Sequence, residues 1–154
     1  MRGTVMDEQY VVTSFKEKFQ LDQLAIYETD DWVLSVRPGQ LTLGSMVLSV
    51  KGYYANFASL PEVMANQMQH MFQMAEKLAK ELFGADKINM LCLMMQDPLV
   101  HFHILPRYAE SVTFAGHTWV DNDWPKPPDI KPVTSSSEIL HKIVESCIGF
   151  IQGK

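Results

Sequence analysis

The histidines at positions 101 and 103 are the residues of this chain best suited to do chemistry. They stand two residues apart in the run Val100-His101-Phe102-His103-Ile104, whose other members are apolar. Successive side chains of a strand point to opposite faces, so a strand here would place both imidazoles on one face. Two residues of strand span about 6.6 Å. That separation suits two imidazoles that hold one phosphate group, or two ligands of one metal ion.

An imidazole in this setting can also act as a nucleophile. Its ordinary pKa of about 6.5 leaves much of it neutral near pH 7, and a neutral ring nitrogen can attack phosphorus to give a covalent intermediate. Pro106 cannot donate to a strand ladder, so we expect it to end the strand and to leave the histidines near a sheet edge or mouth.

A metal site is a second interpretation of the same spacing. Two histidines in a His-x-His pair on a strand can be ligands of zinc or non-haem iron. The third ligand would have to come from Asp97, Glu110 or His117, and none of these stands at a diagnostic spacing. We therefore expect neither a metal nor a cofactor.

The run VHFHILPR resembles the signature of the histidine triad (HIT) family of nucleotide hydrolases and transferases. That signature alternates three histidines with apolar residues and is often followed by Pro-Arg. His101 and His103 stand in the second and third histidine slots, and Leu99 stands in the first. The resemblance spans roughly residues 20–110. It implies that His101 attacks the α-phosphate of a nucleotide derivative and that His103 contacts the phosphate.

The chain departs from the family pattern at three places, which suggest further candidate site residues. The Leu99 side chain has no donor or acceptor, so another residue or a backbone group would have to orient the site. The turn before the motif is short and leaves Gln96 as a candidate for a phosphate or ribose contact. Ser45 stands where other branches have a histidine and is a candidate hydrogen-bonding group.

Arg107, after the motif, is a candidate for a bidentate phosphate contact. The alternative to an enzyme is a catalytically silent nucleotide-binding module.

The composition is that of an ordinary globular protein. Of 154 residues, 47% are hydrophobic and 20% are charged, which is typical of a single soluble domain. A formal net charge of −5 argues against sequence-independent binding to nucleic acid. Cys92 and Cys147 lie in apolar patterns, so we expect two buried free thiols rather than a disulfide, which fits a reducing cytosol. The first ten residues lack a signal-peptide core and no apolar run reaches the ~18 residues of a membrane span, so we expect a cytoplasmic protein with no membrane partner.

Short apolar runs separated by turn residues predict an antiparallel sheet of about five strands. The expected elements before the histidine strand are a short amphipathic helix within 13–24 and strands at 24–28, 32–36, 43–50 and 88–95. A tight turn at 96–98 would join the last of these, expected to be buried, to the histidine strand. A long helix is predicted over 61–83, with a capping box of Ser59 and Glu62 at its start and Gly84 at its end.

The C-terminal part has a different character. A strand is predicted over 114–120, and the Trp- and Pro-rich segment 121–132 reads either as a clip packed on the domain or as a wall of a ligand cleft or partner interface. Ser135 and Glu138 form a second capping box, which starts a helix with an apolar stripe. We therefore expect an α+β fold, with a HIT-like domain over 1–130 and a helical extension over 131–154 packed on that domain or on a partner. The resemblance implies a homodimer in which two sheets join edge to edge.

Overall fold

A five-stranded antiparallel sheet organises the chain, whose computed structural model describes residues 5–153. The strand order is β1-β2-β3-β5-β4. The strands are β1 (Ala25–Glu28), β2 (Trp32–Val36), β3 (Met46–Val50), β4 (Lys87–Leu91) and β5 (His101–Arg107). The expected α+β architecture is confirmed.

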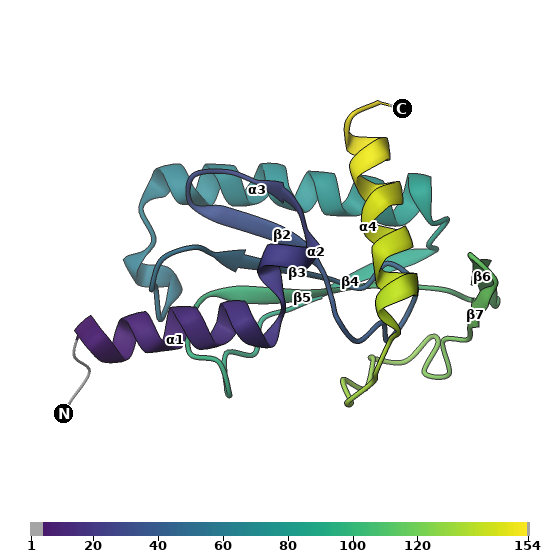
Figure 1. The fold of residues 1–154 in the computed structure, drawn as a ribbon, viewed down its shortest axis with the longest axis horizontal. Coiled ribbons are helices and arrows are strands. Elements are labelled where there is room, and N and C mark those ends of the chain that lie inside the picture. The colour runs from purple at the N-terminus through teal and green to yellow at the C-terminus, as the bar shows by residue number, and fades with distance from the viewer. Residues whose placement is uncertain (1–4, 154) are drawn as a thin grey trace.

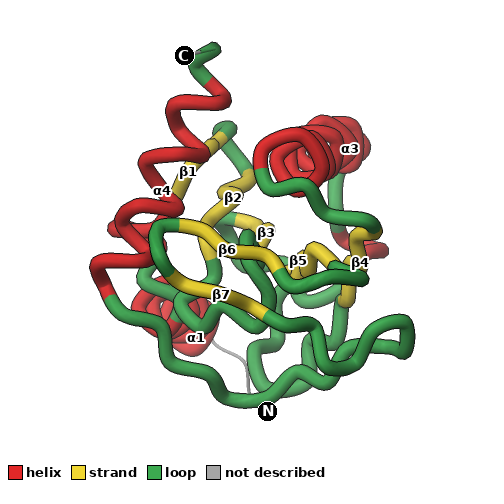
Figure 2. The backbone as a smooth tube through the Cα atoms, turned by 90° about the vertical axis from the view of Figure 1, so that its right-hand side faces the viewer, coloured by secondary structure: helices red, strands yellow, loops and turns green. Residues whose placement is uncertain are grey.

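Helices cover both faces of the sheet and one of its edges (Figures 1 and 2). They are α1 (Val5–Lys18), α2 (Leu21–Leu24), α3 (Glu62–Lys77), which continues through a π-helical segment (Leu78–Leu82), and α4 (Ser137–Ile151). A short 3-10 helix (Phe57–Ser59) precedes α3, and the hairpin β6 (Val112–Phe114) and β7 (His117–Trp119) forms a separate two-stranded sheet. No helix within residues 5–153 is long and apolar enough to cross a membrane.

The long helix α3 lies on the sheet face opposite the histidines. Trp32 donates from its indole to the Met64 carbonyl at 2.9 Å, and the rings of Phe72 and Phe102 meet edge to face with centroids 4.9 Å apart. Gly84, with a φ of 76°, follows this helix and its π-helical segment, as the sequence predicted.

Neither predicted capping box is formed as expected. Ser59 lies in the 3-10 helix and donates to the Asn56 carbonyl, while Pro61 holds the N-cap position of α3 and gives no side-chain cap. In α4 the cap is Ser136, whose hydroxyl accepts from the Ile139 amide. The hydroxyl of Ser135 instead accepts from the Gln40 backbone. Adjacent serines give nearly the same sequence pattern, so tertiary contacts decide which one caps.

The strands near the motif differ from the prediction in position and length. β4 ends at Leu91 and is a half-buried edge strand, so the expected buried strand and tight turn are replaced by a longer connection over 92–100. β5 continues through Pro106 rather than ending there. Pro106 lies beyond the last β3 pair, Met46 with Ile104, and its missing N–H therefore breaks no bond to β3.

The segment 114–120, predicted as one strand, instead contains the turn and the second strand of the β6–β7 hairpin. Ala115 and Gly116 both have positive φ, 50° and 80°, which is the geometry of a tight type I′ turn. Farther along, α4 buries its apolar stripe beside β1 and α2 of the same chain. The C-terminal helix therefore packs on its own domain.

Candidate functional site

His101 and His103 lie side by side on one face of β5, as the alternation of the strand predicted. They pair across the ladder with Ser49 and Val47 of β3, and their ring centroids are 5.2 Å apart in an edge-to-face arrangement. Their exposed fractions are only 2% and 8%. β5 is also flanked by strands on both sides, so the expectation that the histidines lie at an open edge or mouth is wrong for this structure.

The backbone fixes the orientation of the His101 ring. Its Nδ1 lies 2.8 Å from the carbonyl oxygen of Leu99. Since a carbonyl only accepts, Nδ1 carries the proton in this bond, and Nε2 of the neutral ring keeps its lone pair. The residue in the first histidine slot thus contributes its carbonyl group to the site, although its leucine side chain cannot hydrogen-bond.

Both imidazoles are held neutral at pH 7. Burial lowers the pKa of His101 below its ordinary value, against the opposing effects of the Leu99 carbonyl and Asp97. Burial also lowers the pKa of His103, to about 4, and the neighbouring His101 and Arg37 push it in the same direction. Nucleophilic attack requires the neutral form of an imidazole, and burial favours that form in both rings.

Helix α1 covers the histidine pair. The ring of Phe15 packs edge-on against His101 at 5.0 Å, and that of Phe19 lies 5.9 Å from His103. At the end of the helix, Lys18 pairs with Asp97 of the 92–100 connection at 2.8 Å. The sequence predicted a helix in this region but gave no sign that it docks over the motif.

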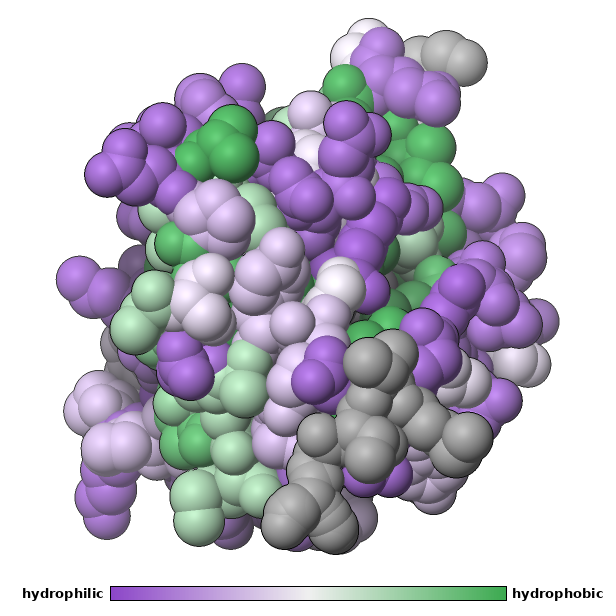
Figure 3. Space-filling model, turned by 90° about the vertical axis from the view of Figure 1, so that its left-hand side faces the viewer, coloured by the Kyte–Doolittle hydropathy of each residue, from purple (hydrophilic) through white to green (hydrophobic). Residues whose placement is uncertain are grey.

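A groove runs beside α1 without reaching the imidazoles. It encloses about 1040 Å³ and is lined by Phe15, Leu99, Val33 and Val50 together with charged residues at its rim. Figure 3 looks onto the end of the molecule where α1 begins and shows hydrophobic residues set back among hydrophilic ones. Phe15 belongs both to this groove and to the cover over His101, so its ring lies between the groove and the histidines.

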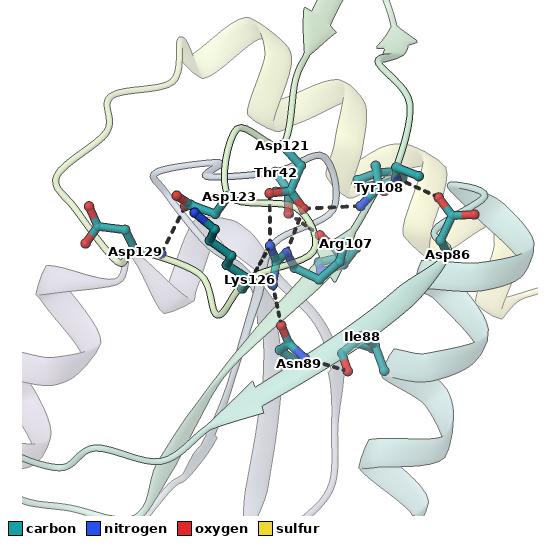
Figure 4. A network of polar contacts seen from close by, with 12 residues as sticks. Thr42, Asp86, Ile88, Asn89, Arg107, Tyr108, Asp121, Asp123, Lys126 and Asp129 are labelled. Carbon is teal, nitrogen blue, oxygen red and sulfur yellow. Dashed lines mark hydrogen bonds and ion pairs between the residues drawn. The ribbon is translucent and has the colours of Figure 1, made fainter.

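Arg107 is engaged within the protein. Its Nε and Nη2 hold both oxygens of Asp121 at 2.6 and 3.1 Å, and its other contacts are with Asn89 and the Lys126 carbonyl (Figure 4). The guanidinium hydrogen bonds keep the pKa of Asp121 below its ordinary value, although burial alone would raise it. Arg107 thereby fastens the segment 121–132 to the sheet as a clip would, and residues 124–128 of the same segment also wall a cavity of about 530 Å³ with Asn89 and Leu91 of β4.

The other two candidates for substrate binding, Ser45 and Gln96, differ in their surroundings. The Ser45 hydroxyl donates to the Thr42 carbonyl at 2.7 Å and accepts from the Thr42 amide, so it braces the loop before β3. Gln96 is exposed in the 92–100 connection, next to Asp97. Within residues 5–153 no three acidic, histidine or cysteine side chains are grouped to hold a metal ion, which leaves the metal interpretation without its third ligand.

Polar residues that sequence reasoning missed share the face of the histidines. Among the described residues, the buried polar side-chain atoms without a hydrogen-bond partner are Arg37 Nε, Ser49 Oγ and His103 Nδ1. Arg37 follows Val33 and Ser35 at alternate positions along and just beyond β2, so strand periodicity could have placed it on this face. Nothing in the sequence indicated that it would lack a carboxylate partner.

Comparison with solved structures identifies the fold as that of the histidine triad proteins. A HIT-like protein involved in cell-cycle regulation from Bartonella henselae aligns with a TM-score of 0.64 and 17% identity over 88% of this chain and 93% of its own. A histidine triad protein from Bradyrhizobium japonicum gives 0.66 and 17% over 88% and 92%, and one from Marinobacter aquaeolei VT8 gives 0.61 and 20% over 89% and 94%. No protein-family model matches the sequence, and no curated protein matches it either.

The fold expected from the motif is therefore confirmed. At these identities the likeness defines the architecture of the chain, and its chemistry has to be argued from its own residues.

Proposed function

We propose that this protein binds a nucleotide derivative and acts at its α-phosphate as a hydrolase or nucleotidyl transferase, with His101 as the nucleophile. The observation that carries the proposal is the hydrogen bond from His101 Nδ1 to the Leu99 carbonyl at 2.8 Å. It leaves the Nε2 lone pair of a neutral ring available, on the same strand face as a second neutral imidazole. The histidine triad fold supports the same class of reaction.

The reaction would proceed in two displacements at phosphorus. His101 Nε2 forms a bond to the α-phosphorus while the bond to the leaving oxygen breaks, and that oxygen takes the electron pair. The positive charge that develops on the His101 ring is stabilised by the Leu99 carbonyl through Nδ1–H. Water or another acceptor then attacks the phosphorus, the P–N bond breaks and the imidazole is regenerated.

His103 would bind and stabilise the phosphate. Its Nδ1 is buried and has no partner among residues 5–153, so in the neutral tautomer that carries its proton on Nδ1 the ring can donate to a phosphate oxygen. A preorganised donor aimed at developing charge typically contributes about 10²–10³-fold in rate. Its pKa of about 4 keeps the ring uncharged throughout the physiological range.

Ligand entry requires α1 to leave the histidine face. Phe15 and Phe19 occupy the space directly over the two rings, and a phosphate cannot reach Nε2 while they stay there. The Lys18–Asp97 ion pair is partly exposed, and such pairs contribute only about 0–1 kcal/mol to the stability of a protein. The aromatic contacts are therefore the main interactions that keep this end of the helix in place. We propose that a bound ligand displaces Phe15 and Phe19 from the histidine rings.

Closure of the site also favours a second candidate, the silent nucleotide-binding module. In that case a nucleotide would bind beside α1 without contact between phosphorus and His101. The two candidates differ in one respect that can be measured, since only the enzyme forms a phosphorus–nitrogen bond.

Turnover of a nucleotide panel tests the proposed function. Dinucleoside polyphosphates, nucleoside phosphoramidates, and aminoacyl and sugar nucleotides of adenine and guanine would be incubated with the protein and with His101→Ala. We expect loss of His101 to lower turnover by at least about 10³-fold, as for other nucleophile deletions. His141→Ala, which removes an exposed histidine of α4, should leave it unchanged. Equal turnover by His101→Ala would reject His101 as the nucleophile.

A further inference from the structure

Two arginines of this protein lie in contrasting environments. Arg107 is almost fully buried and holds Asp121 through two hydrogen bonds. Arg37 is half-buried just beyond β2, and its Nη1 donates to the Gly39 carbonyl at 2.6 Å. Within residues 5–153 no carboxylate pairs with Arg37. Its Nε is buried without any hydrogen-bond partner.

An unpaired guanidinium in such a place is costly. A buried polar atom without a hydrogen-bond partner destabilises a protein, and burial lowers the pKa of Arg37 in keeping with this. Proteins seldom keep such a group without compensation. A bound anion is the simplest compensation that the described residues do not supply.

The position of Arg37 relates it to the histidine site. Its backbone N–H bonds to the Ser45 carbonyl at the start of β3, and β3 pairs on its other side with the strand that carries His103. Two strand spacings, roughly 10 Å, separate the backbone of Arg37 from that of β5. The charge of Arg37 acts on the His103 ring, whose pKa it helps to lower.

The unsatisfied atoms point to one ligand. Arg37 Nε, Ser49 Oγ and His103 Nδ1 come from three adjacent strands and lie on one face of the sheet. A single phosphate at the imidazoles would leave the guanidinium charge near β2 uncompensated. A ligand with a second anionic group on that side would compensate it.

We propose that Arg37 binds a second phosphate group of the ligand, so that the substrates are nucleotide derivatives with a phosphate besides the one that the histidines bind. This inference rests on the proposed function, because it takes the α-phosphate to lie at His101 and His103. A planar guanidinium binds phosphate bidentately. The second phosphate can be the next one along a polyphosphate chain or one carried by the sugar, since both present the same chemistry to Arg37.

Binding of three adenine nucleotides, measured by isothermal titration calorimetry, tests this assignment. The ligands are AMP, ADP and adenosine 3′,5′-bisphosphate, and the guanine series is run in parallel. The proteins are the unchanged chain, Arg37→Gln, Arg37→Lys and Lys142→Gln, which removes one exposed cation from α4. Thermal unfolding of each variant shows whether it is folded.

We expect the unchanged protein to bind ADP or the bisphosphate at least about 10-fold more tightly than AMP, since a hydrogen-bonded charge contributes about 1.5–3 kcal/mol. The tighter of the two ligands identifies the source of the second phosphate. Arg37→Gln should reduce the preference to less than about 3-fold while the AMP affinity stays nearly unchanged. Arg37→Lys should lie between, and Lys142→Gln should behave as the unchanged protein.

Two results would overturn the inference alone. One is a folded Arg37→Gln that keeps the full preference, and the other is an unchanged protein that binds AMP in a His101-dependent way but does not distinguish the three ligands. Absence of binding by every adenine and guanine nucleotide would instead reject the proposed function, and this inference with it.

Discussion

At the scale of single residues, the neighbours of a charged group decide whether it is available to a ligand. Arg107 follows the motif directly and is the arginine that the sequence singles out, yet Asp121 and Asn89 occupy its guanidinium. Arg37 lies outside the motif, and within residues 5–153 no carboxylate pairs with it. The partner of Arg107 stands 14 residues away, and nothing in the sequence fixes that pairing.

Loss of the Arg107–Asp121 pair should destabilise the fold. Asp121→Asn is expected to lower the free energy of unfolding by about 3 kcal/mol, because it leaves a buried guanidinium without its counter-charge. Arg37→Met should leave the free energy of unfolding equal or higher, because it removes a charge that has no counter-charge. Urea unfolding of both variants measures the contrast. Equal destabilisation by the two would mean that Arg37 is a structural residue as well.

The buried histidines should make stability depend on pH. The pKa of His103 falls from about 6.5 when unfolded to about 4 when folded, so between these values the unfolded chain binds more protons and stability rises with pH. The contribution is fully present above about pH 6.5 and is lost as the pH falls towards 4, on the order of 3 kcal/mol in all.

Urea unfolding at several pH values between 4 and 7.5 measures this dependence, with His103→Gln as the matched variant. The variant should show a shallower loss of stability below pH 6.5. Identical pH profiles would show that His103 titrates normally and is not buried as described.

The paired imidazoles were predictable because strand alternation requires only the local sequence. The role of Ser45 was not, since its partner Thr42 lies in the same loop and satisfies it locally. The sequence left open whether another residue or a backbone group orients the site in place of the Leu99 side chain, and in the structure the Leu99 carbonyl contacts the His101 ring. A carbonyl group is present in every residue and leaves no trace in the sequence.

At the scale of elements, the docking of α1 is the feature that controls access to the site. Helix and strand positions follow local patterns, and β2 was predicted to the residue. The face that a helix covers depends on contacts with distant residues, and α1 meets a strand more than 80 positions away. Its apolar residues are also few, so periodicity gave only the end of the helix.

Removal of the aromatic cover should open the site. In the variant Phe15→Ala/Phe19→Ala we expect faster amide exchange in α1 and a nucleotide affinity about 10-fold higher, because the fraction of open molecules limits the apparent affinity. Tyr10→Ala removes an exposed aromatic side chain of the same helix (72% exposed) and should change neither quantity. Weaker binding by the double variant would mean that Phe15 and Phe19 form part of the ligand site.

At the scale of the whole molecule, the sheet has an edge that is available for association. β4 pairs with β5 on one side only, and the connection that follows it exposes Leu93 and Met95 at 53% and 86%. Unpaired strand edges with exposed apolar side chains favour pairing with another chain. We propose, with the resemblance drawn from the motif, that two copies associate along β4.

Sedimentation velocity over a range of concentrations tests the homodimer. We expect a dimer that the double variant Leu93→Lys/Met95→Lys dissociates through charge repulsion. Val120→Lys, which places a lysine at an exposed apolar position after β7, should remain dimeric. If the double variant sediments as the protein without substitutions does, the interface lies elsewhere. If the protein without substitutions is a monomer at every concentration, the dimer is excluded.

The mass of the protein during turnover tests most directly whether His101 is the nucleophile. After brief incubation with a cleavable nucleotide derivative and denaturation in alkali, where a phosphorus–nitrogen bond persists, the intact mass should increase by one nucleotidyl group. We expect this adduct to map to His101 and to be absent from His101→Ala. A substrate that is turned over without any adduct, or an adduct of undiminished yield in His101→Ala, would contradict this expectation.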